Sequence, residues 1–185
     1  DDTLAGAIGV RDELRPEVPE AVQTLRANDV EVSMLTGDNT RTARALAEIA
    51  GIDDVRAELR PEDKASIVAE FSSKTPTAMI GDGINDAPAL AGATVGIAMG
   101  ATGSDAAIDS ADVAFTGHDL RLIPQALQHA RRGSRIINQN IVLSLAIIIV
   151  LMPLAISGVL GLAAVVLVHE VAEVIVILNG LRAAR

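Results

Sequence analysis

The chain of 185 residues has no cysteine, tryptophan or tyrosine, and only two phenylalanines. The lack of cysteine excludes a disulfide framework and agrees with a reducing compartment. The lack of tryptophan and tyrosine removes the aromatic belt that usually marks the ends of membrane helices. Basic residues are also scarce: 15 Lys and Arg face 24 Asp and Glu, and the net charge is −9. This balance argues against nucleic-acid binding, which needs a basic face.

Charged residues are unevenly distributed along the chain. Residues 1–135 mix charged and apolar side chains in globular fashion, whereas residues 141–168 contain no charge at all. This run exceeds the roughly 20 residues that cross a bilayer, and Ser157-Gly158 interrupts it. We therefore expect two transmembrane helices, Asn140–Ile156 and Val159–Leu181. The alternative, two buried helices of a soluble protein, fits poorly because so small a chain cannot enclose them.

Basic residues flank this apolar pair on one side only. The segment 129–135 contains three arginines before the first helix, Arg182 and Arg185 follow the second, and the connecting turn is uncharged. By the positive-inside rule, both flanks and the globular part lie in the cytoplasm of a multi-pass plasma-membrane protein.

The globular part alternates between strand and helix patterns, which predicts a parallel sheet covered by helices. In such open α/β sheets, ligands bind outside the carboxyl ends of the strands. The expected strands are 4–10, 30–35, 55–59, 77–80, 95–99 and 113–116, and the expected helices are 19–27, 40–50, 61–71, 87–91 and 104–111.

The hexapeptide Gly81-Asp82-Gly83-Ile84-Asn85-Asp86 follows one of these strands and brings two carboxylates to its end. Mg²⁺ takes oxygen ligands and is commonly held by one or two carboxylates together with substrate phosphate. A polar surface turn is the alternative, since Gly, Asn and Asp are ordinary turn residues.

Two further segments reach the same edge of the sheet. Thr36-Gly37-Asp38 follows the expected strand 30–35. Lys64 lies in the first turn of the helix that Pro61 begins. Alone, each is typical of a turn or a solvated side chain. A hydroxyl, an ammonium and paired carboxylates after successive strands form a coherent set for phosphoryl transfer. The ammonium and Mg²⁺ would offset the charge of ATP.

Segments 34–39 (MLTGDN), 60–64 (RPEDK) and 79–90 (MIGDGINDAPAL) together resemble the phosphorylation domain of P-type ATPases, which is haloacid dehalogenase-like. The resemblance implies an α/β, Rossmann-like domain followed by two transmembrane helices. It would make Thr36 a hydrogen-bond donor to the transferred phosphoryl group, with Gly37 and Asp38 in its loop and Lys64 as its charge partner. Asp82 would bind Mg²⁺, and Asn85 and Asp86 would complete the phosphate and metal environment.

One family motif is missing from the sequence. The nucleophilic aspartate of P-type ATPases lies in a DKTGT segment, which occurs nowhere in this chain. We therefore expect the attacking Asp upstream, with most of the ATP bound by N-terminal domains that are also missing, and no hydrolysis by this fragment alone. The alternatives are a catalytically inactive membrane subunit that binds partners, and a membrane-anchored phosphatase. The phosphatase would need an Asp-x-Asp nucleophile, and none is present.

The second apolar segment contains His169, Glu170 and Glu173. Ionisable groups at such depth are usually functional, and at about 100° per residue these three share an arc of roughly 100°. A mixed nitrogen and oxygen set suits zinc, cobalt or nickel better than copper(I). A buried ion pair and a proton relay are the alternatives. The His-Glu pair resembles the heavy-metal (type IB) branch, although Val171-Ala172-Glu173 departs from that branch's usual Gly-Gly-Thr.

The sequence thus predicts the C-terminal part of an ATP-driven heavy-metal cation pump with four regions. These are a phosphorylation domain (1–119) without its nucleophile strand, a linking helix (120–139), a two-helix transmembrane hairpin (140–181) and a cytoplasmic tail (182–185). Its expected partners are the lipid bilayer, the transported metal ion and the N-terminal domains and helices of the same pump.

Overall fold

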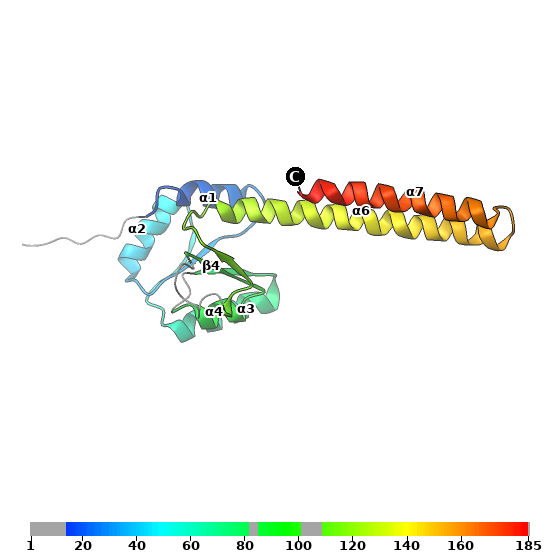
Figure 1. Ribbon diagram of the computed structural model, residues 1–185. Helices are drawn as coiled ribbons and strands as arrows, with labels where there is room; N and C mark the ends of the chain where they lie inside the picture. The colour runs from blue at the N-terminus through cyan, green and yellow to red at the C-terminus, as the bar shows by residue number, and fades with distance from the viewer. Residues whose placement is uncertain (1–13, 82–84, 101–108, 185) are drawn as a thin grey trace, which may run out of the picture. The chain divides into compact units, whose positions relative to one another are not determined.

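The computed structural model describes residues 14–81, 85–100 and 109–184 of the chain (Figure 1). It divides the chain into two compact units, residues 1–122 and residues 123–185. The expected strand 4–10 and most of the expected helix 104–111 lie outside the described residues.

The first unit alternates helices and strands, as the sequence predicts. Asn39 caps α2, because its side chain accepts a hydrogen bond from Thr42 N at 3.0 Å, and Gly51 ends that helix in the left-handed conformation at φ 73°. The elements are α1 (Val18–Arg26), β1 (Ser33–Leu35), α2 (Thr40–Ala50), β2 (Asp54–Arg56), α3 (Pro61–Lys74), β3 (Ala78–Gly81), α4 (Ala87–Gly92), β4 (Val95–Met99) and β5 (Val113–Phe115).

All strand pairs in the described residues are parallel, but they form two sheets. β1 pairs with β2, with Met34 opposite Val55, and a second sheet has the order β3-β4-β5, with Ile80 opposite Ile97. The predicted parallel α/β architecture is confirmed. Within the described residues, β1 and β3 each keep one edge without a strand partner.

Two apolar clusters hold the first unit together. In one, Val68 of α3 and Leu90 of α4 are almost fully buried and pack with Met79 of β3. Val68 lies one turn after Lys64, and Leu90 lies one turn after Asp86. This cluster therefore fixes the two helices at whose starts the predicted residues Lys64 and Asp86 lie. The second cluster joins α1 to the end of α2 through Val18, Val22 and Ala50.

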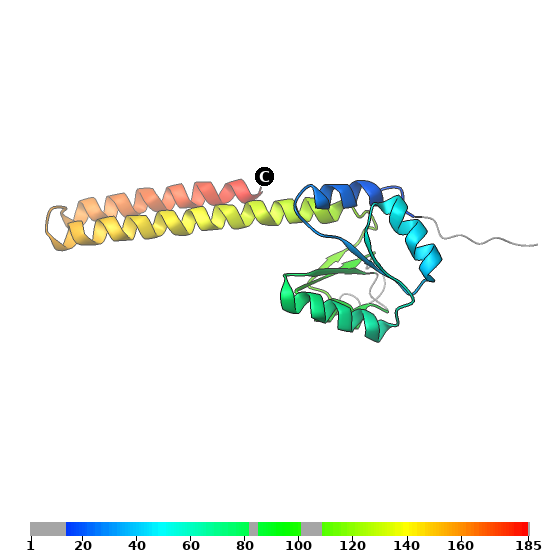
Figure 2. The same cartoon turned by 180° about the vertical axis from the view of Figure 1, so that it is seen from behind.

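The second unit consists of two long helices that run side by side in opposite directions (Figures 1 and 2), α6 (Leu122–Ile156) and α7 (Leu162–Gly180), with a short 3₁₀ turn, η1 (Leu181–Ala184), after α7. Both helices are long and apolar enough to cross a membrane. The expected linking helix and first crossing form one uninterrupted helix, which contains Pro153. The second helix starts at Leu162, later than predicted, because Gly158 at φ 73° turns the chain and Gly161 caps α7.

Candidate functional site

The loop after β1 holds Thr36 and Asp38 in direct contact. The Thr36 hydroxyl donates to Asp38 Oδ2 at 2.9 Å and accepts from Asp38 N at 3.1 Å. Both residues are only partly exposed. The hydroxyl thus stands at the carboxyl end of a parallel strand, where an open α/β sheet binds its ligands.

The segment before α3 braces this loop. Leu59 N donates to Thr36 O at 3.1 Å, and Glu58 N donates to Asp38 O at 2.9 Å. A Cβ on Gly37 would lie 3.3 Å from Leu59 O, so glycine allows the two backbones to approach. Glu58 adopts a left-handed φ of 59°, and its carboxylate accepts a bond from the Thr40 hydroxyl at 3.2 Å. The sequence prediction did not include Glu58, and no local motif indicates that this residue braces the loop after β1.

Lys64 and Asp86 form the second pair of the site. Lys64 Nζ donates to Asp86 Oδ1 at 2.8 Å, and the two side chains are 17% and 14% exposed. Pro61 starts α3 and the Asp63 carboxylate accepts from Arg60 N at 3.0 Å, which sets the helix start and so the position of Lys64. Asp86 precedes α4, but its side chain makes no capping bond there. The carboxylate instead faces the ammonium.

Gly81 is required where β3 ends, because a Cβ there would lie 2.8 Å from Asp86 Oδ2 and 2.9 Å from Asp86 Cβ. A larger residue would displace the carboxylate. Asn85 is described and exposed in the turn before α4. Asp82, the predicted Mg²⁺ ligand, lies outside the described residues.

The two pairs supply the kinds of atoms that a Mg²⁺ ion with a phosphate group needs. Thr36, Asp38 and Asp86 offer only hydroxyl and carboxylate oxygens, which are the ligands that Mg²⁺ takes. Lys64 adds one ammonium for the phosphate. Within the described residues, no group of three or more His, Asp or Glu side chains is arranged to hold a metal by itself.

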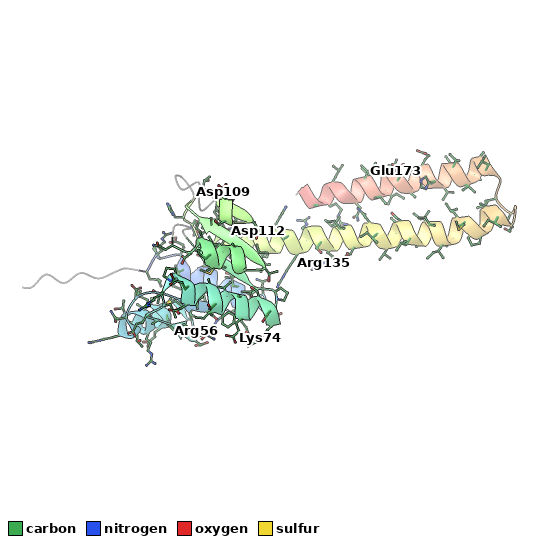
Figure 3. All side chains as sticks on the ribbon, turned by 90° about the horizontal axis from the view of Figure 1, so that it is seen from below. Arg56, Lys74, Asp109, Asp112, Arg135 and Glu173 are labelled. Carbon is green, nitrogen blue, oxygen red and sulfur yellow. The ribbon has the colours of Figure 1, made fainter. Side chains whose placement is uncertain are left out.

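His169, Glu170 and Glu173 are all exposed on α7, and Figure 3 labels Glu173 there. In the described part of the chain they do not gather into a metal-binding group with α6. The polar contacts between the two helices lie nearer the end of α7. Asn179 Nδ2 donates to Asn140 Oδ1 at 2.8 Å, and Asn140 Nδ2 donates to Val176 O at 3.3 Å. The sequence prediction gave Asn140 only as the start of the first crossing and did not single out Asn179, although both are amides at the edges of apolar runs.

The strongest electrostatic perturbations lie away from these groups. The Arg121 guanidinium hydrogen-bonds to Asp119, at 2.8 Å from Oδ2, and so lowers the pKa of that carboxyl below its ordinary value of 3.8. Asp119 in turn raises the pKa of Arg121. Lys74 lowers the pKa of Glu70, its neighbour one turn earlier on α3, through a hydrogen bond of 2.6 Å. These exposed pairs belong to the surface of the unit.

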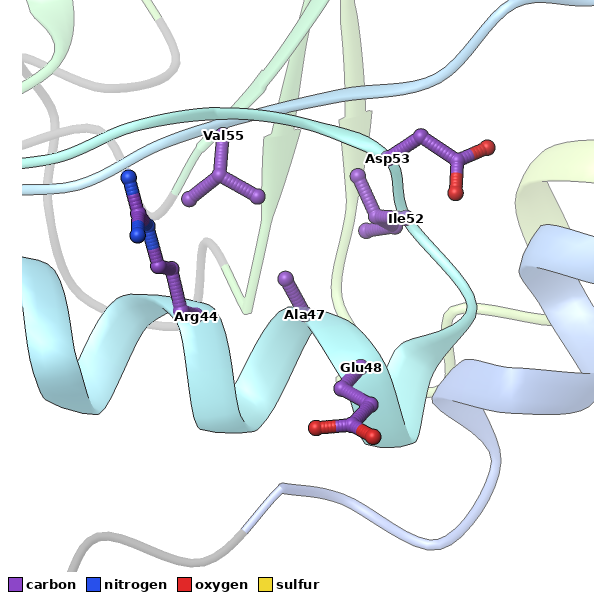
Figure 4. A pocket seen from close by; sticks show the side chains of 6 residues that line it. All are labelled: Arg44, Ala47, Glu48, Ile52, Asp53 and Val55. Carbon is purple, nitrogen blue, oxygen red and sulfur yellow. The ribbon is translucent and has the colours of Figure 1, made fainter.

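A cavity of about 480 Å³ opens beside the C-terminal half of α2 (Figure 4). Its walls come from α2 and from the segment that leads into β2, and they contain none of the predicted site residues. The lining residues are Arg44, Ala47, Glu48, Ile52, Asp53 and Val55.

The family model of haloacid dehalogenase-like hydrolases matches residues 1–94, just over half of the chain. The chain belongs to this family. Within it, the whole chain aligns with the probable cation-transporting ATPase G of Mycobacterium tuberculosis (strain H37Rv), with 65% identity over 185 residues that make up 24% of that protein. The zinc-transporting ATPase of Bacillus subtilis (strain 168) is 43% identical over 98% of this chain and 29% of its own length.

A solved structure agrees with both units. The crystal structure of a zinc-transporting PIB-type ATPase in the E2.Pi state matches with a TM-score of 0.88 and 40% identity, over 95% of this chain and 29% of that one. The predicted resemblance to heavy-metal P-type ATPases is confirmed, as is the prediction of a membrane protein with a haloacid dehalogenase-like domain and two membrane helices. The chain spans about a quarter of the length of the curated relatives it matches.

Proposed function

We propose that this chain is the phosphoryl-transfer and final membrane part of an ATP-driven pump for divalent heavy-metal cations. One observation carries the proposal: a single chain combines the Thr36 and Lys64–Asp86 groups at the carboxyl ends of parallel strands with two membrane helices, one of which contains His169 and Glu170. A membrane-anchored phosphatase would need the groups at the strand ends but no ionisable residues within its membrane helices. A passive membrane subunit would need neither the groups at the strand ends nor those ionisable residues.

The side chains at the sheet edge hold and balance the phosphoryl group. Thr36, being neutral, would orient phosphoryl oxygens without adding charge once its hydroxyl turns from Asp38. Lys64, which lies 2.8 Å from Asp86, would turn to the phosphoryl oxygens when their negative charge arrives. Gly37, Asp38 and Asn85 would shape the surrounding loops. Mg²⁺, held by Asp82 with Asp86, would supply further charge neutralisation.

The open edges of β1 and β3 support an upstream nucleophile. Among the described residues neither edge has a strand partner, and Thr36 and Asp86 each follow one of these strands. A parallel strand inserted between them would bring the side chain at its own carboxyl end between those two groups. We infer that this strand carries the phosphorylated aspartate, within the N-terminal part of the same pump.

The transported ion would be zinc, cobalt or nickel, which suit a nitrogen and oxygen set. α7 exposes three ionisable side chains among otherwise apolar ones, namely His169, Glu170 and Glu173. Such groups are expensive against lipid, so earlier helices of the same pump would cover them and complete the site. The names of the relatives favour zinc and add cadmium to the candidates.

The direct test is ATP-driven metal uptake by the complete protein in inside-out membrane vesicles. We expect zinc, cobalt, nickel or cadmium to accumulate only when ATP and Mg²⁺ are both present, and Thr36→Ala to slow the uptake. ATP hydrolysis without uptake of any of these ions would favour the phosphatase alternative, and neither activity would favour the inactive subunit.

A further inference from the structure

α7 ends part of the way along α6, and α6 continues past it (Figure 1). The Asn140–Asn179 contact sets this alignment, and a Cβ on Gly180 would lie 3.9 Å from Asn140 Nδ2. The face of α6 that packs on α7 therefore emerges beyond the end of its partner.

A cavity of about 480 Å³ lies at this point. Its lining residues from α6 recur at intervals of three and four, so they occupy one face of the helix, and Arg182 adds a wall from η1. The lining residues are Gln125, Gln128, His129, Arg132, Arg135, Ile136 and Arg182. Three arginines, two amides and an imidazole thus converge on one hollow.

Within the described residues of the second unit, no carboxylate lines the cavity. The only acidic residues in 123–185 are Glu170 and Glu173, and neither lines the cavity. Arg182 donates to the neutral Asn179 Oδ1 at 2.8 Å. Arg132 and Arg135 are exposed, and no salt bridge involves them within the described residues. The cavity therefore carries a net positive charge in a chain whose total charge is −9.

The position of the cavity points to the membrane surface. Ile136, which lines the cavity, is 4% exposed, whereas Ile137 and Ile141 on another face of α6 are 59% and 52% exposed. The uncharged apolar run begins at Ile141. The basic hollow thus lies on the stretch of α6 just before its uncharged apolar run, on the flank that the positive-inside pattern predicts to be cytoplasmic.

We propose that this cavity binds the phosphate head group of an anionic phospholipid at the level where the apolar run of α6 begins. Arginine forks bind phosphate oxygens in pairs, glutamine amides reach the glycerol oxygens, and anionic lipids concentrate at the cytoplasmic leaflet of membranes. Free phosphate would satisfy the same arginines, but the place of the cavity next to the apolar run of α6 favours a lipid.

The test measures lipid retention by the complete protein in neutral detergent. Phosphatidylglycerol or phosphatidylcholine is added, and native mass spectrometry counts the bound lipids. We expect Arg132→Gln and Arg135→Gln each to lower the preference for phosphatidylglycerol about fivefold, which corresponds to about 1 kcal/mol per arginine. Arg135→Lys keeps the charge and should keep most of the preference, which separates head-group binding from a folding defect.

Arg131→Gln is the matched control, since Arg131 lies on the same helix but does not line the cavity. Its effect should stay below about twofold, the size of a diffuse and screened attraction. Equal losses of phosphatidylglycerol preference in Arg131→Gln and Arg135→Gln would overturn the proposal. A wild-type protein that shows no preference for phosphatidylglycerol, because another segment fills the cavity, would overturn it as well. Displacement of the lipid by millimolar inorganic phosphate would assign the site to free phosphate instead.

Discussion

Replacing Lys64 with methionine should slow phosphorylation of the complete pump from ATP. Lys64 Nζ lies 2.8 Å from Asp86 Oδ1, and the two side chains are 17% and 14% exposed. Because water reaches these side chains poorly, Lys64→Met removes the ammonium that would face the phosphoryl group and leaves the Asp86 carboxylate without a positive partner. A preorganised contact of this kind contributes about 2.7–4 kcal/mol to the transition state, which is about 10²–10³ in rate.

The assay is rapid-quench incorporation of radiolabelled phosphate from ATP. Lys64→Arg keeps the charge and should give an intermediate rate, because a guanidinium is wider and cannot reproduce the geometry of the ammonium. Lys74→Met is the matched control: Lys74 is on the same helix and lies 2.6 Å from Glu70, but the side chains are 66% and 53% exposed. A rate for Lys64→Met within about threefold of the wild type would refute the reasoning, because that difference is under 1 kcal/mol.

Three other predictions test separate parts of the chain. Gly96→Ala would bring a Cβ to 2.6 Å from Leu90 O and should destabilise the protein by about 1–3 kcal/mol, which lowers the melting temperature. Gly133→Ala is the control, because its Cβ meets open space, and it should leave the melting temperature unchanged or raise it. The pKa of the Asp119 carboxyl lies below its ordinary value of 3.8, so its bond to Arg121 stabilises the fold above pH 3.8, and this stabilisation is lost as the pH falls through the pKa of the folded protein. In Arg121→Gln, carboxyl NMR should show the pKa of Asp119 back at 3.8. An unmoved pKa would contradict the assigned cause. Glu170→Gln and Glu173→Gln should each weaken the metal dependence of phosphoenzyme formation, and unaltered dependence in both variants would exclude these carboxylates from the transport site.

Local signals allowed some elements to be predicted residue by residue. The observed helix Thr40–Ala50 and strand Val95–Met99 match their predicted bounds. The first has a side-chain cap at Asn39 and a left-handed Gly51, both readable from neighbouring residues. The start of α7 was predicted too early because the turn at Gly158 continues to Gly161, and an apolar sequence does not show where a turn ends.

Contacts between distant residues could not be predicted in the same way. The sequence placed Lys64 and Asp86 at one edge, but their direct pairing joins residues 22 apart and depends on how α3 and α4 pack around Val68 and Leu90. The division into two sheets depends on which strands pair, and the hydrophobic periodicity of a strand does not show its partner. The Asn140–Asn179 contact depends on the alignment of two helices whose apolar surfaces allow many registers.

The proposed function requires the acidic segment after β3 to hold Mg²⁺ beside a phosphorylated aspartate of a metal-activated pump. The most direct measurement is labelling of the complete protein with radiolabelled ATP, with and without zinc, followed by hydroxylamine, which cleaves acyl phosphates. We expect labelling that requires both Mg²⁺ and zinc, that hydroxylamine removes and that Asp82→Ala abolishes. Label that resists hydroxylamine, or normal labelling of Asp82→Ala, would contradict it.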